Sequence, residues 1–455
     1  MTVNGYVSHW FTEVPAARPP LPGDADADIC IVGAGYTGLW TAYYLKQADP
    51  SLRITVLEAR FAGFGASGRN GGWLSGLAPG HRTLLAEQHG RQAVIDWQRA
   101  LNDAVDEVIA VAQREGIDAD IVKGGTLDIA RNEPQVQRLK AMVDEDQSWG
   151  VDEVRFLSKE EAAQRINVPS LLLAAFTPHC ARIQPAKLAR GLADVVERLG
   201  VTIYENTAVT DIRPGVAITE RGTVRAPIVL RATEGFTTTL PGLKRRWLPM
   251  SSAMIATEPL SSQTWAEIGW EGRETLGDTA HGFFYAQRTA DDRIAIGGRA
   301  MPYRYASGID RDGQVSRETI TYLTGVLNAL LPQTRGAGIA HGWCGVLGVP
   351  RDWSAGVDLD RATGLGWAGG YVGHGVTATN LAGQTLADLV LKRDTPLLRM
   401  PWVGHHSKTW EPEPLRWLGV RGMYTAYKAA DDHEARGRGT TSPIAVIADR
   451  IARRP

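Results

Sequence analysis

Cysteine, excess charge and long hydrophobic runs are all scarce in this sequence of 455 residues. The three cysteines, Cys30, Cys180 and Cys344, are too few and too far apart for a disulfide framework, so we expect a protein of the reducing cytoplasm. Lys and Arg number 49 and Asp and Glu 50, and this balance argues against nucleic acid or a membrane surface as a partner. No run of about 18 apolar residues could span a membrane, and no secretory signal pattern opens the sequence.

Glycine is abundant, with 50 residues, and five of these glycines fall within Phe61–Trp73 (FAGFGASGRNGGW). Such a segment can bury little apolar surface, and glycine loses more conformational freedom on folding than any other residue. This composition is typical of a backbone that a ligand approaches closely. Arg69 and Asn70 lie in the middle of it and offer directional polar contacts.

A dinucleotide-binding fingerprint precedes this segment. Ile29–Val32 is predicted to be a strand, the G-x-G-x-x-G of Gly33–Gly38 follows at once, and a helical pattern comes next. A second predicted strand, Ile54–Leu57, ends on Glu58. In this arrangement the first glycine permits a tight turn, the second lets a pyrophosphate reach the helix N-terminus, and the acid accepts from ribose hydroxyls.

Later stretches are expected to complete the same unit. Ala186–Gly200 is predicted to be a helix, Val201–Val209 and Ala226–Leu230 are predicted to be strands, and a further helix is predicted to begin near Val376. Gly364–Gly369 also fits G-x-G-x-x-G, but it lacks a preceding apolar strand and a following acid. We therefore expect one nucleotide site and no second site for NAD(P)H.

Six stretches together resemble a known family: VGAGYTGLWTAYYL, EARFAGFGASGRNGGW, YENTAV, RATEG, RTADDRIAIGG and GYVGHGV. They resemble the FAD-dependent D-amino-acid oxidase superfamily (glycine/sarcosine oxidase type) and, within it, gamma-glutamylputrescine oxidoreductase-like proteins. The resemblance implies an α/β fold in which a Rossmann-like FAD-binding domain is interleaved with a substrate domain built on a mixed or antiparallel sheet. It assigns residues 25–88, 178–240 and 340–396 to the FAD domain, 89–177 and 241–339 to the substrate domain, and 397–455 to a C-terminal helical extension.

The resemblance also implies which residues hold FAD. Gly33–Gly38 would bind the pyrophosphate, Glu58 the adenosine ribose, Val209 the adenine, and Gly373–Val376 the pyrimidine edge of the flavin. The full expected set is Gly33, Ala34, Gly35, Tyr36, Thr37, Gly38, Glu58, Ala59, Arg60, Gly65, Ala66, Ser67, Arg69, Asn70, Gly71, Gly72, Trp73, Val209, Ala232, Thr233, Gly345, Gly373, His374, Gly375 and Val376.

Three side chains are candidates for direct roles in catalysis, although the flavin itself carries the redox chemistry. Arg69 would contact the pyrophosphate, the flavin or a substrate anion, or else form a structural ion pair. Tyr285 would line the substrate pocket or pack in the core. His374 would act through its side chain or serve only as a spacer in its glycine-rich turn.

Two further features have competing interpretations. Cys344 could attach FAD covalently, as a cysteine does in sarcosine oxidases, but we expect a small buried cysteine and non-covalent FAD. His405 and His406 could bind a metal, but we expect a solvated pair and no metal site.

The expected function is FAD-dependent oxidation of a C–N bond in a small amine or amino acid. Hydride transfer to the flavin gives an imine, which water hydrolyses to an aldehyde or keto acid, and oxygen is the expected acceptor, giving hydrogen peroxide. The alternative is a dehydrogenase of the same fold that acts on a 2-hydroxy acid or passes electrons to another acceptor.

Overall fold

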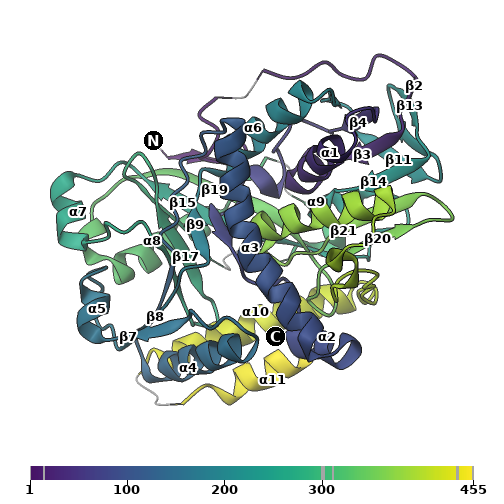
Figure 1. Ribbon diagram of the computed structural model, residues 1–455. Helices are drawn as coiled ribbons and strands as arrows, with labels where there is room; N and C mark the ends of the chain where they lie inside the picture. The colour runs from purple at the N-terminus through teal and green to yellow at the C-terminus, as the bar shows by residue number, and fades with distance from the viewer. Residues whose placement is uncertain (1, 14–15, 299–302, 310–311, 437–439, 453–455) are drawn as a thin grey trace.

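The computed structural model describes all residues except 1, 14–15, 299–302, 310–311, 437–439 and 453–455. Its strands form two large sheets that lie side by side (Figure 1). The six-stranded sheet has the order β10-β4-β3-β14-β21-β20 and is parallel apart from the β20–β21 pair. Its strands are β3 (Ile29–Val32), β4 (Ile54–Leu57), β10 (Thr202–Tyr204), β14 (Ile228–Arg231), β20 (Gly356–Asp360) and β21 (Leu365–Gly369).

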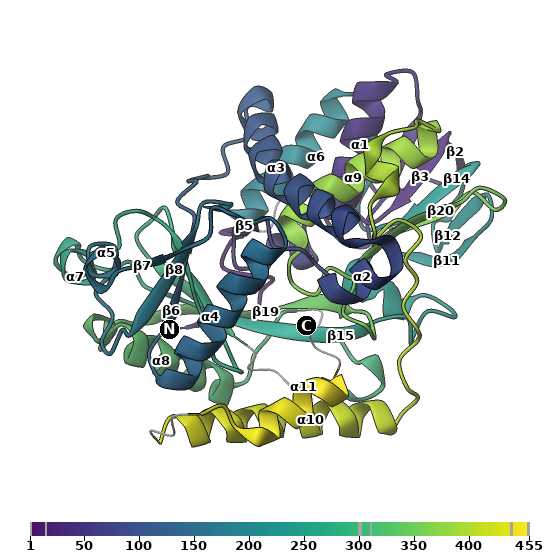
Figure 2. The ribbon, with the colours of Figure 1, turned by 60° about the horizontal axis from the view of Figure 1, so that its bottom comes forward.

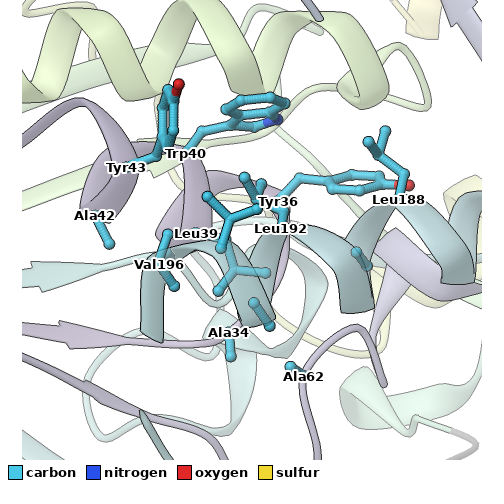
Figure 3. Packing of buried hydrophobic residues seen from close by; sticks show 14 of the residues in the cluster. Ala34, Tyr36, Leu39, Trp40, Ala42, Tyr43, Ala62, Leu188, Leu192 and Val196 are labelled. Carbon is cyan, nitrogen blue, oxygen red and sulfur yellow. The ribbon is translucent and has the colours of Figure 1, made fainter. Parts of the chain in front are cut away.

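Long helices cover one face of this sheet. Helix α1 packs against both α6 and α9, and α9 in turn packs against α3. The bounds are α1 (Tyr36–Ala48), α2 (Arg82–His89), α3 (Arg91–Glu115), α6 (Pro185–Arg198) and α9 (Gly375–Leu391). Figure 3 shows the core between α1 and α6, where Leu39, Leu192 and Val196 are buried together. Burial of this apolar face is the main stabilising contribution to the layer.

A small four-stranded sheet covers the opposite face. Its order is β11-β12-β13-β2, and Ala217 and Val224 from it share a buried cluster with Cys30 and Leu57 of the large sheet. The strands are β2 (Ala25–Asp26), β11 (Val209–Arg213), β12 (Val216–Thr219) and β13 (Gly222–Arg225). The dinucleotide fingerprint at the end of β3 is therefore held between two covered faces.

The nine-stranded sheet is mixed, with the order β1-β19-β15-β18-β17-β16-β6-β8-β7. Only the β1–β19 and β16–β6 pairs in it are parallel. Its strands are β1 (Val3–Asn4), β6 (Thr126–Ala130), β7 (Arg155–Leu157), β8 (Leu173–Thr177), β15 (Leu248–Thr257), β16 (Thr275–Asp278), β17 (Phe284–Arg288), β18 (Ile294–Gly298) and β19 (Ile339–Val349). Strand β19 pairs along its length with β15, although residues 340–349 fall within a segment expected in the FAD domain.

Shorter helices surround this sheet, and the C-terminal segment forms a helical hairpin beneath it. In Figure 2 the hairpin α10–α11 runs along the edge of the molecule below β15. The helices are α4 (Glu133–Ser148), α5 (Lys159–Ala163), α7 (Ser262–Ile268), α8 (Arg317–Leu330), α10 (Leu415–Glu434) and α11 (Pro443–Ala452), and a two-stranded sheet joins β5 (Trp73–Ser75) to β9 (Cys180–Arg182). Among the described helices, none is long and apolar enough to cross a membrane.

The predicted α/β architecture is confirmed, but one predicted strand is wrong. The segment Val201–Val209 contains β10, which belongs to the six-stranded sheet, and the first residue of β11, which belongs to the four-stranded sheet. The chain turns between them at Asn206, whose φ is +50°, and the buried carboxylate of Glu205 accepts from Arg18, Arg190 and the backbone of Ala62. Residues that anchor a turn through distant partners leave no strand-breaking pattern in the local sequence.

Candidate active site

A single cavity of about 980 Å³ extends from the fingerprint at β3 to the face of the nine-stranded sheet. Both large sheets and the glycine-rich segment after β4 contribute to its walls. Among the residues expected to hold FAD, all line this cavity except Ala34, Gly38 and Gly72. The walls are largely apolar and aromatic, with a few polar groups, as in sites that bind an organic cofactor.

The turn between β3 and α1 requires glycine. Gly33 has φ +110°, and a Cβ on it would lie 2.6 Å from the carbonyl oxygen of Ala232. A Cβ on Gly38 would lie 2.1 Å from the carbonyl oxygen of Gly33, so this glycine permits close helix–strand packing and does not face the cavity. The backbone at the start of α1 is thereby held open to the cavity.

Glu58 lies at the end of β4 beside this turn. Its two carboxylate oxygens accept from the backbone N–H of Ala34 at 2.9 Å and of Arg60 at 3.0 Å. Burial raises the pKa of Glu58 even though these backbone hydrogen bonds favour the carboxylate. Val209, at the start of β11, lines the same end of the cavity.

The glycine-rich segment is held by its own polar side chains. Asn70 Nδ2 donates to the carbonyls of Ala66 and Ser67, and its Oδ1 accepts from the N–H of Gly72. Ser67 Oγ accepts from the N–H of Tyr36 at 2.8 Å, which ties the segment to the first turn of α1. Asn70 and Ser67 thus organise the loop as well as lining the cavity.

Arg69 is almost fully buried, at 2% exposure. Its Nε donates to the carbonyl of Phe64 at 2.8 Å, Nη1 lies 3.4 Å from the carbonyl oxygen of Cys344, and the guanidinium covers the Phe64 ring at 4.3 Å. Arg69 therefore joins the glycine-rich segment to β19 and reaches the cavity from behind that segment.

The N-terminus of α9 opens into the cavity from another side. His374 is its N-cap residue, with an exposed side chain that makes no capping hydrogen bond, and Gly373 before it has φ +100°. Neither α9 nor α1 has an acidic residue in its first turn or a capping bond from its N-cap side chain. Two helix N-termini thus present their positive ends to one cavity.

Glu234 is a cavity residue whose importance was missed from sequence. Its Oε1 accepts from the N–H of Gly348 at 3.0 Å and its Oε2 from the N–H of Gly370 at 2.9 Å. It therefore joins β19 of one sheet to the turn before α9 of the other. Burial raises the pKa of Glu234 to about 7. It falls within the stretch RATEG, but nothing local reveals the two distant donors.

The cavity ends on the face of the nine-stranded sheet. There the Tyr285 hydroxyl lies 2.6 Å from Ser252 Oγ, and the Tyr285 ring meets Trp73 edge to face at 6.3 Å between centroids. Burial raises the pKa of Tyr285 to about 12. Asp128 of β6 and Asp278 of β16 add two carboxylates to the same end. Sequence reasoning identified Tyr285 but neither aspartate.

The remaining expected residue, Gly72, packs away from the cavity. A Cβ there would lie 1.9 Å from Gln287 Nε2, which donates to the carbonyls of Gly71 and Ile183. Gln287 is 1% exposed, so it supports the glycine-rich segment from β17 rather than facing a ligand.

The Cys344 side chain is buried in the core of the nine-stranded sheet, and Cys344 does not line the cavity, whereas the adjacent Gly345 does. His405 and His406 bind different carboxylates, those of Asp352 at 2.9 Å and Asp358 at 2.6 Å. The two histidines therefore do not converge on a common point.

Within the described residues, His281, Asp431 and Glu434 form one group with spacing suited to a metal. Arg138 already occupies this group, since its guanidinium binds both carboxylate oxygens of Glu434 and approaches His281 Nε2 at 3.2 Å. The ion pair joins α4 to α10 and anchors the C-terminal hairpin. The Arg138 guanidinium is thus the cation that this group of side chains binds.

The cavity fits a dinucleotide with a ring system at its far end. A glycine turn, a buried acid and the α1 N-terminus lie at one end, and a second helix N-terminus lies where negative charge would develop on a reduced flavin. These features suit FAD, whose pyrophosphate needs backbone donors and whose ring needs a flat, largely apolar wall.

Comparison with known proteins agrees with this geometry. Residues 28–389 match the family described as DAO, FAD dependent oxidoreductase. The chain is 31% identical to gamma-glutamylputrescine oxidoreductase of Escherichia coli over 80% of this chain and 83% of that protein. It is 28% identical to the probable oxidoreductase OrdL of Haemophilus influenzae, over 83% and 86% respectively.

Among solved structures, glycine oxidase from Geobacillus kaustophilus superposes with a TM-score of 0.66 at 23% identity, covering 82% of this chain and 96% of that one. L-proline dehydrogenase from P. horikoshii gives the same TM-score at 19% identity, covering 84% and 98%. These likenesses show a shared fold, and the family match extends over most of the chain. The protein is an FAD-dependent oxidoreductase and belongs to the DAO family.

Proposed function

We propose that this enzyme oxidises a C–N bond of a small amine or amino acid and passes the electrons to oxygen, forming hydrogen peroxide. The observation that carries the proposal is one continuous cavity with a dinucleotide cradle at one end and an aromatic, acid-bearing sheet face at the other. The relatives named for a putrescine derivative and for glycine support an amine donor.

In this proposal the cavity residues divide along its length. Gly33, Gly35 and Glu58 would hold the pyrophosphate and ribose of FAD, and the N-terminus of α9 would face the flavin. The side of the molecule built on the six-stranded sheet would thus bind the cofactor, and the nine-stranded sheet would bind the substrate. FAD, when bound, accepts the hydride from the carbon next to the substrate nitrogen.

The protein residues would position and desolvate the amine. Trp73 and Tyr285 offer two aromatic surfaces that exclude water, and a less polar surrounding lowers the pKa of a bound amine toward the neutral, reactive form. No described side chain has to act as a nucleophile.

We propose a reducing compartment for the enzyme, because Cys30, Cys180 and Cys344 are buried and not disulfide-bonded.

The test is a substrate panel on the yellow purified protein. Primary and secondary amines, amino acids and 2-hydroxy acids are each supplied with oxygen, and peroxide and carbonyl products are measured. We expect turnover of amines with equal yields of the two products. Turnover of 2-hydroxy acids alone would refute amine oxidation, and amine turnover only with an artificial dye would identify a dehydrogenase.

We expect FAD to be bound without a covalent bond, because the Cys344 thiol packs in the core of the sheet and does not line the cavity. Acid precipitation should leave the yellow colour in the supernatant. The variant Cys344→Ser should purify with as much FAD as the wild type. A yellow pellet that turns white in the Cys344→Ser variant would show attachment at this cysteine.

A further inference from the structure

Strand pairing places an acid and an aromatic ring in one row on the cavity face of the nine-stranded sheet. Gly277 of β16 pairs with Asp128 of β6 on one side and with Tyr285 of β17 on the other. Side chains of directly paired residues lie on the same face of a sheet. Asp128 and Tyr285 are therefore two strand spacings, about 10 Å, apart at the backbone with a glycine between them.

The lack of a side chain at Gly277 lets its neighbours approach the backbone closely. A Cβ on Gly277 would lie 2.6 Å from Asp128 Oδ1 and 3.2 Å from the Cη2 atom of the Trp73 indole. Asp128 and Trp73 thus come close together over the bare backbone of Gly277, next to Tyr285 in the same row, and all four residues line the cavity. Carboxylates and aromatic faces both attract cations.

The charge of Asp128 is not balanced by the chain. Within the described residues its carboxylate makes no ion pair or side-chain hydrogen bond, and the charged groups that act on it are two further acids, Asp146 and Asp278. Asp146 is already paired with Arg82 at 2.8 Å, and Asp278 accepts from the N–H of Phe284. Burial and the two neighbouring acids raise the pKa of Asp128 to about 7.

The pKa of Asp278 is also raised above its usual value. Burial raises this pKa to about 6. The positive charge of Arg131 favours the ionised carboxylate, and the negative charge of Asp431 disfavours it. Lysine is absent from the described residues that line the cavity, and the arginines there are Arg60, beside Glu58, and Arg69, bonded to backbone carbonyls. Among the described residues that line the cavity, no further Lys or Arg is present beside Asp128 to receive a substrate carboxylate.

We propose that Asp128, assisted by Asp278 and the rings of Trp73 and Tyr285, binds a cationic nitrogen of the substrate other than the one that is oxidised. The preferred substrates are then diamines or longer polyamines rather than amino acids. This inference rests on the proposed function and names its substrate class. An incoming ammonium would supply the countercharge that the half-buried carboxylate lacks.

The test uses three four-carbon amines that differ only at the far end: 1,4-diaminobutane, n-butylamine and 4-aminobutanoate. Each is mixed rapidly with the FAD-loaded enzyme without oxygen. The affinity is taken from the concentration dependence of the bleaching rate or, where the flavin is not bleached, from the shift of its oxidised absorbance. The wild type should bind the diamine most tightly and the amino acid least. In Asp128→Asn the diamine should bind about 10- to 100-fold more weakly, and n-butylamine should be unaffected.

The matched control is Asp144→Asn, which removes the same charge from the exposed face of α4 and should leave all three affinities unchanged. If Asp128→Asn does not yield FAD-loaded protein, Gly277→Ala is the second variant. Its Cβ would lie 2.6 Å from the present position of Asp128 Oδ1, so it should displace this carboxylate and also weaken diamine binding. A diamine preference that survives in Asp128→Asn, or tighter wild-type binding of 4-aminobutanoate, would overturn the proposal. If the diamine binds most tightly and 4-aminobutanoate least, but no amine bleaches the flavin, the cation site is supported and the proposed function is wrong.

Discussion

The variant Gly33→Ala is expected to purify without FAD. Its Cβ would lie 2.6 Å from the carbonyl oxygen of Ala232, and the φ of +110° is one that alanine rarely adopts. A strained backbone conformation costs about 1–3 kcal/mol, and relief by movement of the turn would displace the donors at the start of α1. We expect FAD affinity to fall by at least about 100-fold, measured by flavin fluorescence during titration of the apoprotein.

The matched control for this substitution is Gly325→Ala in α8. Gly325 is exposed, and apart from its own stretch of helix backbone no described atom lies within 4 Å of the position of its Cβ. Alanine at such a helix position is expected to stabilise the protein by about 1 kcal/mol and leave FAD binding unchanged. Normal FAD content in Gly33→Ala would contradict the placement of the pyrophosphate at this turn.

The variant Glu234→Ala is expected to destabilise the protein by about 3–5 kcal/mol. It leaves the N–H groups of Gly348 and Gly370 without their acceptor, at about 1–3 kcal/mol for each buried donor. It also removes the acid that favours the buried guanidinium of Arg231, whose pKa is lowered by burial to about 9. The measurement is the urea dependence of unfolding of the FAD-loaded protein.

The comparison with Glu234→Gln adds a pH test. Because burial raises the pKa of Glu234 from about 4.5 to about 7, the folded wild type retains a proton that the unfolded chain releases. Wild-type stability should therefore fall relative to Glu234→Gln as pH rises from about 4.5 to 7. Glu87→Ala, on the exposed side of α2, controls for loss of a carboxylate. Equal stability of Glu234→Ala and Glu87→Ala would refute the bridging role.

The part of the site that local sequence patterns predicted is nearly contiguous in the chain, whereas Val209, Gly345 and Gly373–Val376 were expected from the family resemblance and also line the cavity. Strand, glycine turn and helix of the fingerprint lie within Ile29–Ala48, and β4 brings Glu58 beside the turn by direct pairing with β3. Local patterns are sufficient there because each residue acts on a near neighbour. The glycine-rich segment was predicted for the same reason, since Asn70 and Ser67 bond within it or to α1.

The rest of the site depends on pairing between distant segments. Asp128 reaches Tyr285 only because β6 pairs with β16, about 150 residues later in the chain. Glu234 acquires its role from donors at Gly348, in β19 of the nine-stranded sheet, and at Gly370, in the turn that follows β21 of the six-stranded sheet. An isolated aspartate in a short strand has no local feature that distinguishes a ligand-binding residue from an exposed one.

The most direct test of the account is a single turnover without oxygen. The FAD-loaded enzyme is mixed with 1,4-diaminobutane, and the yellow flavin absorbance and the carbonyl product are measured together. We predict that the flavin bleaches fully and that one carbonyl forms for each FAD reduced. A flavin that stays oxidised with every amine but is bleached by a 2-hydroxy acid would contradict amine oxidation in this cavity.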